Sequence, residues 1–416
     1  MIVDVEGAGS VEPAQPALLR ELNERAVLDT IRRLPGISRA ETARRTGLSK
    51  PTVSLALRTL EDSGLVRPSR TGSDRPGRTG ILYEAVPDAA LAGALEITVT
   101  GVRGVAVDLE GNVVGRGSAS WRSPRSAASI YDAVARCVER VRSAVPGGRH
   151  LDCLALGTPG VIDPTTGVLT RTGTIPVLDG SVPAEEVARR VDLPVEVLND
   201  VDLAALGEQS EGPGHEVPDF AVLWVGSGVG AALVLDGRLH LGHRGGAGEV
   251  ADVPFGRVAA AAPGVVREFA TTGATSDGIE ELAARLADSG AATGLSAPFT
   301  AQAVLDSALV GDPLGEEVVA ELATWTAWYV TVLAAVVDPE LVVLGGPIGS
   351  HDALLGPVQR HLGELLDAPP QVMTSKLGDA SVLAGAAATA RRTAAELAFG
   401  RRVLERSGPA GTGGRS

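Results

Sequence analysis

Residues 38–60 constrain the fold of this chain more than any other segment, because they encode two short helices joined by a glycine turn. Ser38 with Glu41 three residues later is a capping-box pattern, which predicts the start of the first helix. Gly47 ends that helix, and Ser49 provides a cap for the next one. The spacing predicts a helix-turn-helix, and an ordinary helical hairpin is the alternative.

The second of these helices has one apolar face and one polar, basic face. Val53, Ala56, Leu57 and Leu60 recur at helical spacing and predict the buried side. A short helix with a basic N-terminal half suits DNA, where its first turns meet base edges and phosphates. In this segment, the residues expected to contact DNA are Ser38, Arg39, Ser49, Lys50, Thr52, Ser54 and Arg58.

A hairpin follows the second helix and predicts a wing. Gly64-Leu65-Val66 is expected to start one strand, and Ile81-Leu82-Tyr83 to form its return partner. The Gly/Pro-rich loop between them carries arginines that could reach phosphates or a minor groove, with a solvated charged loop as the alternative. The wing residues expected to contact DNA are Arg67, Arg70, Arg75 and Arg78.

Charge is distributed unevenly along the chain. Residues 20–83 contain 13 Lys+Arg and 7 Asp+Glu, a net charge of +6, whereas the whole chain carries −14, so the remainder carries −20. A basic N-terminal part on an acidic body predicts DNA contact confined to the basic part.

The composition bounds the number of domains and the class of protein. With 416 residues and 44% hydrophobic content, the chain should hold two or three domains. Its two cysteines, Cys137 and Cys153, are too few for a disulfide framework or a four-cysteine zinc site. An acidic N-terminus and no apolar run of membrane-spanning length predict a cytoplasmic protein. The expected organisation is a disordered N-terminus (1–17), a winged helix-turn-helix domain (18–86), an α/β body (87–398) and a disordered tail (399–416).

The body contains two similar hairpins. GVAVDLEGNVVGRG runs from Gly104 to Gly117, and GAALVLDGRLHLGH runs from Gly230 to His243. Each reads as a strand, a glycine-containing turn and a second strand. The same hairpin in two halves predicts a duplicated fold with a cleft between the halves, although two hairpins can also be similar by chance.

Five further blocks follow one another along the body. They are GTPGVIDPTTGVL from Gly157, LNDVDLAALGE from Leu198, WVGSGVGAALVLDGRLHLGHRGGAGEVADV from Trp224, DPELVVLGGPI from Asp338 and LGDASVLAGAAATA from Leu377. With the winged helix in front, they resemble a repressor-type member of the ROK family (repressors, open reading frames, kinases) over essentially the whole chain. The resemblance implies an actin-like, ribonuclease H-like sugar-kinase fold of two lobes for the body.

The resemblance also locates the nucleotide-binding segments of the family's kinases. Their phosphate-binding hairpin, Asp-x-Gly-x-Thr, falls on residues 96–100, where this chain has Glu96 and Thr98 in place of the acid and the glycine. Because the glycine lets the backbone approach a phosphate, the change implies poor nucleotide binding and argues against an enzyme. The glycine loop 226–230 and Gly345-Gly346 are interpreted as turns rather than as phosphate sites.

A sugar site is implied by the same resemblance. Asn199-Asp200 matches the family pair in which the carboxylate is a general base on a sugar hydroxyl. Without a nucleotide to accept the phosphoryl group, Asp200 is interpreted as a hydroxyl acceptor at a vestigial base position, and no catalytic residue is assigned. An Asx turn capping the next helix is the alternative. The implied sugar-binding residues are Thr174, Asn199, Asp200, Glu249 and Asp252, with Thr174 and Asp252 departing from the family's asparagine and histidine.

No metal or other cofactor is predicted. The cysteine-rich zinc loop of the family is replaced by FGRVAAAAPGVVRE, from Phe255, which supplies no thiolate. His240 and His243 are therefore interpreted as surface residues. Arg267 aligns with the glutamate that closes the family loop, and it implies an acidic sugar if it faces the cleft. A pocket that has lost sugar binding is the other interpretation.

These patterns together predict a homodimeric transcriptional regulator, most simply a repressor of carbohydrate genes. Its expected partners are a palindromic operator, with half-sites about one helical turn or a small multiple apart, and a sugar or sugar derivative, but no membrane. The alternative is an ATP-dependent sugar kinase with a DNA-binding head. A protein-interaction scaffold on an inactive kinase fold is a third possibility.

Overall fold

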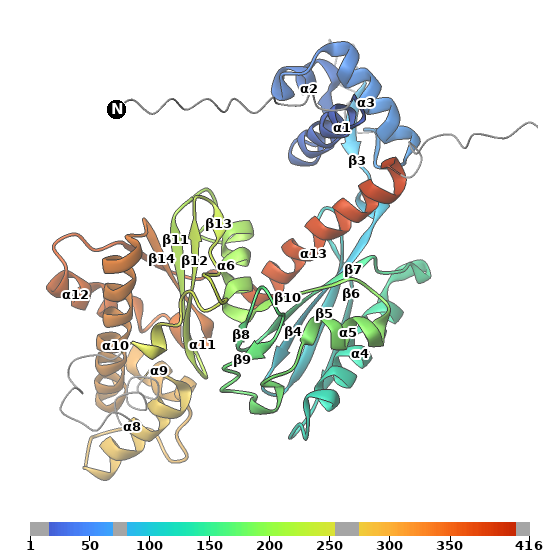
Figure 1. Cartoon of the computed structure of the whole chain (residues 1–416). Coiled ribbons are helices and arrows are strands. Elements are labelled where there is room, and N and C mark those ends of the chain that lie inside the picture. The colour runs from blue at the N-terminus through green and yellow to red at the C-terminus, as the bar shows by residue number, and fades with distance from the viewer. Residues whose placement is uncertain (1–15, 70–80, 254–273, 405–416) are drawn as a thin grey trace, which may run out of the picture. The chain divides into compact units, whose positions relative to one another are not determined.

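The computed structural model describes residues 16–69, 81–253 and 274–404. Its contacts divide the chain into two compact units (Figure 1). The head unit comprises the described residues up to Ala90, with Asp108–Glu110 and the described residues from Thr393 onward. The body unit comprises Leu91–Val107 and the described residues of Gly111–Arg392.

Three helices and a small sheet form the N-terminal part of the head unit. The sheet has the order β1-β3-β2, and both pairings are antiparallel. Val27, Ile31, Val53 and Leu60 are fully buried between the helices and form the centre of its core. The elements are α1 (Pro16–Arg33), β1 (Ile37–Ser38), α2 (Arg39–Thr46), α3 (Lys50–Asp62), β2 (Val66–Pro68) and β3 (Leu82–Ala85).

The helix-turn-helix forms with the expected caps, while the Glu41 carboxylate, the other half of the capping-box pattern, binds Arg44 and Arg45. The Ser38 hydroxyl accepts a hydrogen bond from the Glu41 N–H at 3.3 Å and caps α2, which ends at Gly47 in the left-handed conformation. The Ser49 hydroxyl accepts from the Thr52 N–H at 3.2 Å and caps α3. The four apolar residues expected on the inner face of α3 are all buried, so its fold is set by local sequence.

The wing hairpin is present, with its strands shifted slightly along the chain. β2 pairs with β3 in the register Val66↔Ala85, so pairing starts at Val66 rather than at Gly64. Gly64 instead lies in the turn that follows α3, where its N–H donates to the Glu61 carbonyl at 2.9 Å. Three of the wing residues expected to contact DNA, Arg70, Arg75 and Arg78, lie outside the described residues.

The head unit also contains the C-terminal end of the described chain. Helix α13 (Ser381–Phe399) runs into a π-helical turn, η7 (Gly400–Leu404). Phe399 and Val403 are 2% and 1% exposed, and the Arg25 guanidinium lies 4.7 Å from the Phe399 ring centroid. Arg402 donates to the carbonyl oxygen of Ala89 at 2.6 Å. Residues 399–404 are thus helical and packed, unlike the disordered tail expected there, because the apolar side chains of Phe399 and Val403 are buried in the head unit.

The body unit is built on two five-stranded sheets with the same topology (Figure 1). When the five strands of each sheet are numbered along the chain, their order across the sheet is 3-2-1-4-5. The first, fourth and fifth strands are parallel to one another. The duplication expected from the two hairpins is therefore confirmed. The first sheet contains β4 (Leu91–Thr98), β5 (Gly101–Asp108), β6 (Val113–Ser120), β7 (Cys153–Thr158) and β10 (Val195–Asn199), and the second contains β11 (Phe220–Val225), β12 (Val229–Leu235), β13 (Arg238–Leu239), β14 (Leu341–Gly345) and β15 (Gln371–Thr374).

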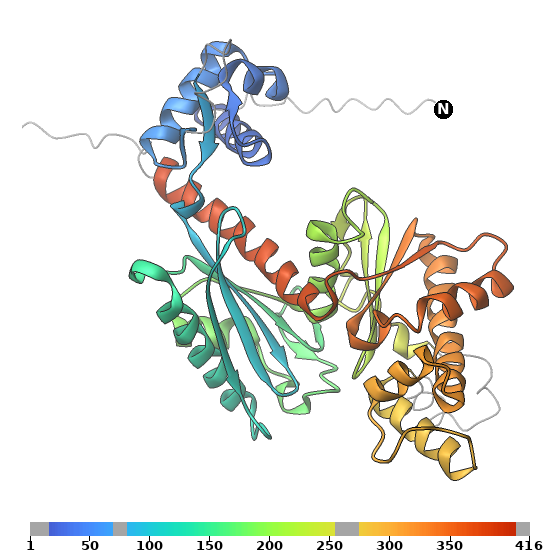
Figure 2. The ribbon, with the colours of Figure 1, turned by 180° about the vertical axis from the view of Figure 1, so that it is seen from behind.

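Helices cover these sheets. On the first sheet, α4 buries Ile130, Val134, Cys137 and Val141 at helical spacing, and it lies along one face of the strands (Figure 2). The remaining elements are a two-stranded sheet of β8 (Val161–Ile162) and β9 (Leu169–Thr170), the 3-10 turns η1 (Pro87–Ala89), η2 (Pro146–Gly148), η3 (Pro176–Leu178), η4 (Val250–Asp252) and η6 (Gly378–Ala380), and the helices α4 (Ala127–Ala144), α5 (Pro183–Val191), α6 (Asp200–Glu211), α8 (Ser276–Asp288), α9 (Ala301–Leu309), α10 (Pro313–Val337), α11 (Gly346–Gly349) and α12 (Leu355–Leu365).

Helix α10 corrects one expectation. Among the described residues it is the one helix with the length and apolar composition of a membrane span, whereas no run of that length was expected. Its side chains from Leu314 to Leu333 contribute to the apolar core beside the second sheet, where α10 packs against α9 and α12. Burial on several sides explains why a core helix is apolar around most of its circumference.

Helices α6 and α13 cross in backbone contact within the body unit. A Cβ atom added at Gly385 would lie 1.7 Å from the Leu203 carbonyl oxygen, and one added at Gly207 would lie 2.2 Å from the Ser381 carbonyl oxygen. Only glycine allows so close an approach at these two positions. The crossing joins α6, which begins at Asp200, to α13, whose last residues belong to the head unit.

Candidate functional site

The exposed side of α3 carries the basic residues predicted to contact DNA. Lys50, the first residue of α3, is exposed, and Arg58 is exposed on the side of the helix opposite its buried residues. Thr52 and Ser54 are half-buried, and their hydroxyls already have partners in the motif: Thr52 pairs with the Ser49 hydroxyl at 2.8 Å, and Ser54 donates to the Lys50 carbonyl at 2.8 Å. The two hydroxyls therefore help to shape the helix as well as its surface.

Two further arginines predicted to contact DNA are oriented by neighbouring groups. Arg39, in the first turn of α2, donates to the Ser54 hydroxyl at 3.3 Å and so ties the two helices together. Arg67, on β2, donates to the Glu84 carboxylate at 2.8 Å, and its side chain remains 51% exposed. An exposed ion pair of this kind is weak enough for the guanidinium to exchange partners.

In the body unit, Asn199 is fixed where β10 ends and α6 begins. Its side-chain oxygen accepts from the Val201 N–H at 2.8 Å and the Asp202 N–H at 3.2 Å, and its amide nitrogen donates to the Gly160 carbonyl at 2.9 Å. The helix-capping alternative is therefore the geometry that Asn199 adopts. Its neighbour Asp200 is left at the first turn of α6 with its carboxylate accepting from the Val201 N–H at 3.0 Å.

Three carboxyl groups lie close to one another at this point. Burial raises the pKa of Asp200 to about 6, and the Glu249 carboxylate contributes to the shift. Burial also raises the pKa of Asp202 to about 7, with additional repulsion from Asp200 and Glu249. Asp202 is 7% exposed, and none of the described residues hydrogen-bonds to its carboxylate. Sequence analysis missed Asp202, although it lies two residues after Asp200 in the same helical turn.

Arg171 connects two of the predicted sugar-binding residues. Its Nη1 lies 2.6 Å from Asp252 Oδ2 and 3.6 Å from Glu249 Oε2. Burial raises the pKa of Glu249, and the Arg171 guanidinium opposes the shift. Arg171 has a φ of 55°, a conformation unusual for a residue with a side chain. Such backbone strain is found where a side chain must be aimed, but no sequence pattern marked this residue.

The predicted residues are thus only partly brought together. We call Asn199, Asp200, Asp202, Glu249, Arg171 and Asp252 the Asp200 site. Thr174 lies exposed between β9 and η3 and forms no hydrogen bond with the described residues, so no contact links it to this group. Gly160, whose carbonyl orients Asn199, has a φ of 102°, and a Cβ there would lie 2.7 Å from the Thr170 carbonyl, next to Arg171.

Side chains within residues 96–100, the segment expected to resemble the phosphate-binding hairpin, are hydrogen-bonded to other residues of the chain. Arg103 Nε donates to Glu96 Oε2 at 2.6 Å, and its guanidinium also donates to the Asp379 carbonyl. Burial raises the pKa of Glu96, while Arg103 opposes the shift. The Thr98 hydroxyl donates to the Gly101 carbonyl at 3.1 Å. The Arg103 guanidinium, the Glu96 carboxylate and the Thr98 hydroxyl are therefore all engaged in hydrogen bonds at the β4–β5 hairpin.

The glycine loops form turns. Gly226 donates its N–H to the Gly228 carbonyl at 2.9 Å in the β11–β12 hairpin, as expected. A Cβ at Gly346 would lie 2.4 Å from the Val225 carbonyl, so close packing alone accounts for that glycine. His240 and His243 are exposed, and Arg267 and the segment that replaces the zinc loop lie outside the described residues. Within the described ranges no group of three or more His, Cys, Asp or Glu residues is arranged to hold a metal ion.

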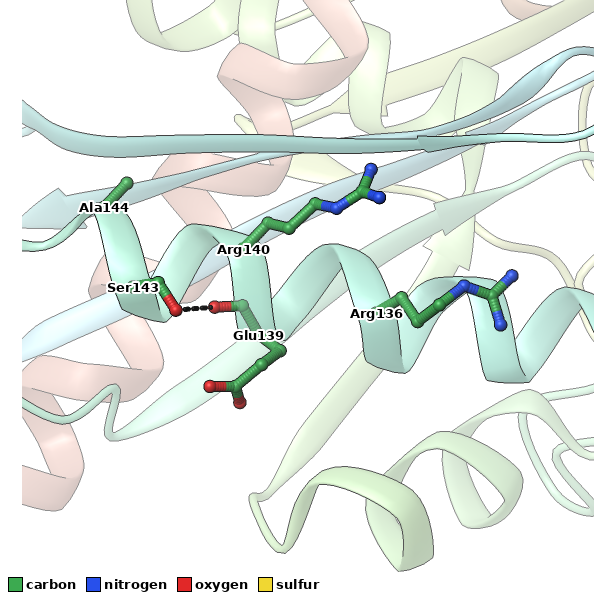
Figure 3. Close-up of a pocket in the computed structure, with 5 residues that line it drawn as sticks. All are labelled: Arg136, Glu139, Arg140, Ser143 and Ala144. Carbon is green, nitrogen blue, oxygen red and sulfur yellow. Dashed lines mark hydrogen bonds between the residues drawn. The ribbon is translucent and has the colours of Figure 1, made fainter.

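Two hollows on the body unit lie apart from the Asp200 site. One, of about 530 Å³, is formed entirely by exposed residues of α4, where the Ser143 hydroxyl donates to the Glu139 carbonyl at 2.8 Å (Figure 3). The other, of about 380 Å³, lies among α8, α10 and α12 and is lined in part by Trp325 and His361. Neither contains a residue of the Asp200 site, so neither adds to the site expected from sequence.

Comparisons with protein families assign both parts of the chain. Residues 92–393 match the ROK family, and residues 20–67 match a winged helix-turn-helix DNA-binding family. The first match covers most of the chain and the body unit almost completely, while the second covers α1, α2, α3 and the start of the wing.

Individual relatives include regulators and kinases. The chain is 26% identical over 235 residues to a xylose repressor of Caldicellulosiruptor bescii, covering 56% of this chain and 58% of the relative. It is 30% identical over 224 residues to a glucokinase of Halalkalibacterium halodurans, covering 50% of this chain and 65% of the relative. The match therefore spans less than two thirds of the length of either relative.

Solved structures support the fold. A ROK family transcriptional regulator, a homolog of the E. coli MLC protein, superimposes with a TM-score of 0.77 at 18% identity, covering 93% of this chain and 99% of that one. A ROK family glucokinase from Streptomyces griseus, in complex with glucose and AMPPNP, superimposes with a TM-score of 0.62 at 24% identity, covering 73% of this chain and 100% of that one. Of these two structures, the regulator covers the larger share of this chain.

Proposed function

The chain belongs to the ROK family and carries a winged helix-turn-helix in front of the family domain, and we propose that it is a sugar-controlled transcriptional repressor of carbohydrate genes. The observation that carries the proposal is the pair of exposed cations on α3, with Lys50 in its first turn and Arg58 on the side opposite its buried face. A helix of this kind enters the major groove and reads base edges. Two copies of the chain bind a palindromic operator as a homodimer.

The Asp200 site binds the effector in this proposal. Carboxylates are acceptors for sugar hydroxyls, and Asp200, Asp202 and Glu249 supply several within one small region. Arg171 forms ion pairs with Glu249 and Asp252. The hydroxyl groups of a ligand that enters there replace the guanidinium as partners of these carboxylates. Because carboxyl groups outnumber guanidinium groups at the site, a neutral sugar fits the described residues better than an acidic one.

Loss of phosphoryl transfer is the second part of the proposal. The pairing of Arg103 with Glu96, together with Thr98 at the glycine position, supports it, because a phosphate would have to displace both. The glucokinase among the relatives supports the alternative, a kinase with a DNA-binding head. The two functions differ in their need for ATP.

The effector acts on the head through α6 and α13. A sugar contacting Asn199 and Asp200 touches the first turn of α6, which crosses α13 at Gly207 and Gly385. The last turn of α13 carries Phe399, which is buried in the head unit. A shift of α6 therefore reaches the head along one continuous helix, with a coupling free energy typically of about 1–3 kcal/mol.

The first experiment is recovery of genomic DNA bound by the purified chain, followed by release with a panel of neutral, acidic and amino sugars. Release from one site by one sugar supports the proposal, and retention with every sugar favours a protein that has lost effector binding. A coupled ATP assay on the same sugars tests the kinase alternative. Turnover at ordinary kinase rates, about 1–100 per second, contradicts the proposal.

Arg58→Ala tests the head directly, with Arg136→Ala on the exposed face of α4 as the matched arginine control. Loss of a base contact costs about 1–3 kcal/mol on the operator and less on unrelated DNA. Equal losses on both DNAs would reduce Arg58 to a phosphate contact.

A further inference from the structure

The exposed side of α3 carries one large apolar side chain, Leu55. Leu55 is 54% exposed, whereas the other four aliphatic residues of the helix, Val53, Ala56, Leu57 and Leu60, are all buried. Its position lies four residues after Pro51 and three before Arg58, both of which are exposed. At helical spacing these three residues form one continuous strip directly opposite the buried face.

The surroundings of Leu55 indicate what covers it. Arg58 lies three residues away on the same strip, Lys50 lies in the first turn of the same helix, and Arg39 is attached to the helix by its hydrogen bond to Ser54. One short helix with three cations on or against it and an exposed leucine beside Arg58 suits an anionic surface that also offers an apolar group. A second copy of the same basic strip would meet it with like charges, which opposes pairing of two such faces.

Duplex DNA provides that combination in one place. Its phosphates are anionic, and the apolar feature of the major groove is the 5-methyl group of thymine. We infer that α3 reads thymine through Leu55, next to the base pair contacted by Arg58. The inference rests on the proposed DNA-binding function and names the base that the helix selects.

The spacing along α3 supports neighbouring base pairs. Leu55 and Arg58 are three residues apart, about 4.5 Å along the helix axis, and base pairs are stacked about 3.4 Å apart. A guanine read by Arg58 through its two major-groove acceptors therefore lies beside the thymine at Leu55. The selected half-site contains a T next to a G on one strand or a T next to a C, according to which strand presents each base.

The test uses the full chain and a site selected from random duplex DNA. Each thymine of the selected half-site is replaced in turn by deoxyuridine, which keeps the base pair and removes only the methyl group. Affinity is measured for the wild type, for Leu55→Ala and for Leu309→Ala. Leu309 is also 54% exposed and lies on α9 of the body unit, so it controls for loss of an exposed leucine.

The expected result is one thymine whose methyl group and Leu55 depend on each other. Removing that methyl lowers wild-type affinity about fourfold per half-site, the value of one buried methyl group. Leu55→Ala lowers affinity for the thymine site by at least the same factor, but it binds the deoxyuridine site as tightly as the wild type does. Leu309→Ala has wild-type affinity for both sites. Thermal unfolding of Leu55→Ala matches the wild type, because an exposed side chain adds little to stability.

Other outcomes overturn the inference in distinguishable ways. If the affinity losses from Leu55→Ala and from deoxyuridine multiply at every thymine, Leu55 contacts no methyl group. The proposed DNA-binding function is still supported in that case, because the chain has selected a site. A change of oligomeric state in Leu55→Ala, measured by sedimentation, assigns the leucine to a second copy of the chain instead. Failure to select any site overturns the DNA-binding function together with the inference.

Discussion

The head unit should lose much of its stability when one side chain is removed from the opposite end of the chain. Phe399 is 2% exposed among residues of the head. The Arg25 guanidinium lies over its ring, 4.7 Å from the ring centroid. Truncating a buried phenylalanine to alanine costs about 3–5 kcal/mol. A unit of roughly 80 described residues has a stability of about 4–12 kcal/mol, so Phe399→Ala removes a large share of it.

Hydrogen exchange on the full chain measures this loss. In Phe399→Ala, the amides of α3 should exchange about 100- to 4,000-fold faster, because each 1.4 kcal/mol is a factor of about ten. The body amides of β11 should keep their wild-type rates. Phe399→Leu, which retains most of the volume, should recover most of the protection.

A matched core substitution in the body separates this effect from general destabilisation. Phe220 on β11 is fully buried in the body unit, so Phe220→Ala should accelerate exchange in β11. Unchanged α3 rates in Phe399→Ala, or equal acceleration in both units, would refute the assignment of residue 399 to the head.

Three further substitutions probe the body unit. Gly385→Ala places a methyl group 1.7 Å from the Leu203 carbonyl, so we expect lower stability and an operator affinity that no longer responds to sugar; a normal sugar response in a binding titration would argue against the α6–α13 route. Asp202 has a pKa of about 7 in the folded chain, above its unfolded value. Its contribution to the free energy of unfolding is therefore fully present at acidic pH and is lost as the pH rises from about 4 through 7, by at most about 4 kcal/mol. Asp202→Asn should therefore flatten the decline in melting temperature between pH 5 and 8, and an unchanged slope would show that Asp202 does not titrate in that range. Arg171→Ala frees the Glu249 carboxylate and should change sugar affinity at least threefold, as measured by calorimetry, and equal affinity would place the effector elsewhere.

Local sequence was sufficient to predict the helix-turn-helix of the head unit. The caps Ser38 and Ser49 and the four buried residues of α3 follow from contacts between residues three or four apart, which any helix of that sequence makes. The two hairpins of the body, with turns at Gly111 and Gly237, were predictable for the same reason. Each of these features depends on neighbours along the chain, so the pattern of residues already contains it.

The contacts that shape the Asp200 site depend on the tertiary structure. Arg171 meets Asp252 across 81 positions of sequence, Arg103 meets Asp379 across 276, and no periodicity relates such residues. Asp202 was visible in the sequence, but its raised pKa comes from burial and from two carboxylates that the fold brings near it.

The same distinction applies to the end of the chain. Residues 399–404 were expected to belong to a disordered tail, and their packing against α1 and the turn after α3 makes them part of the head. Short-range hydrogen bonding and side-chain periodicity therefore set the elements of this protein. Burial and ion pairing between distant segments, which exist only once the chain has folded, decide which residues form its sites.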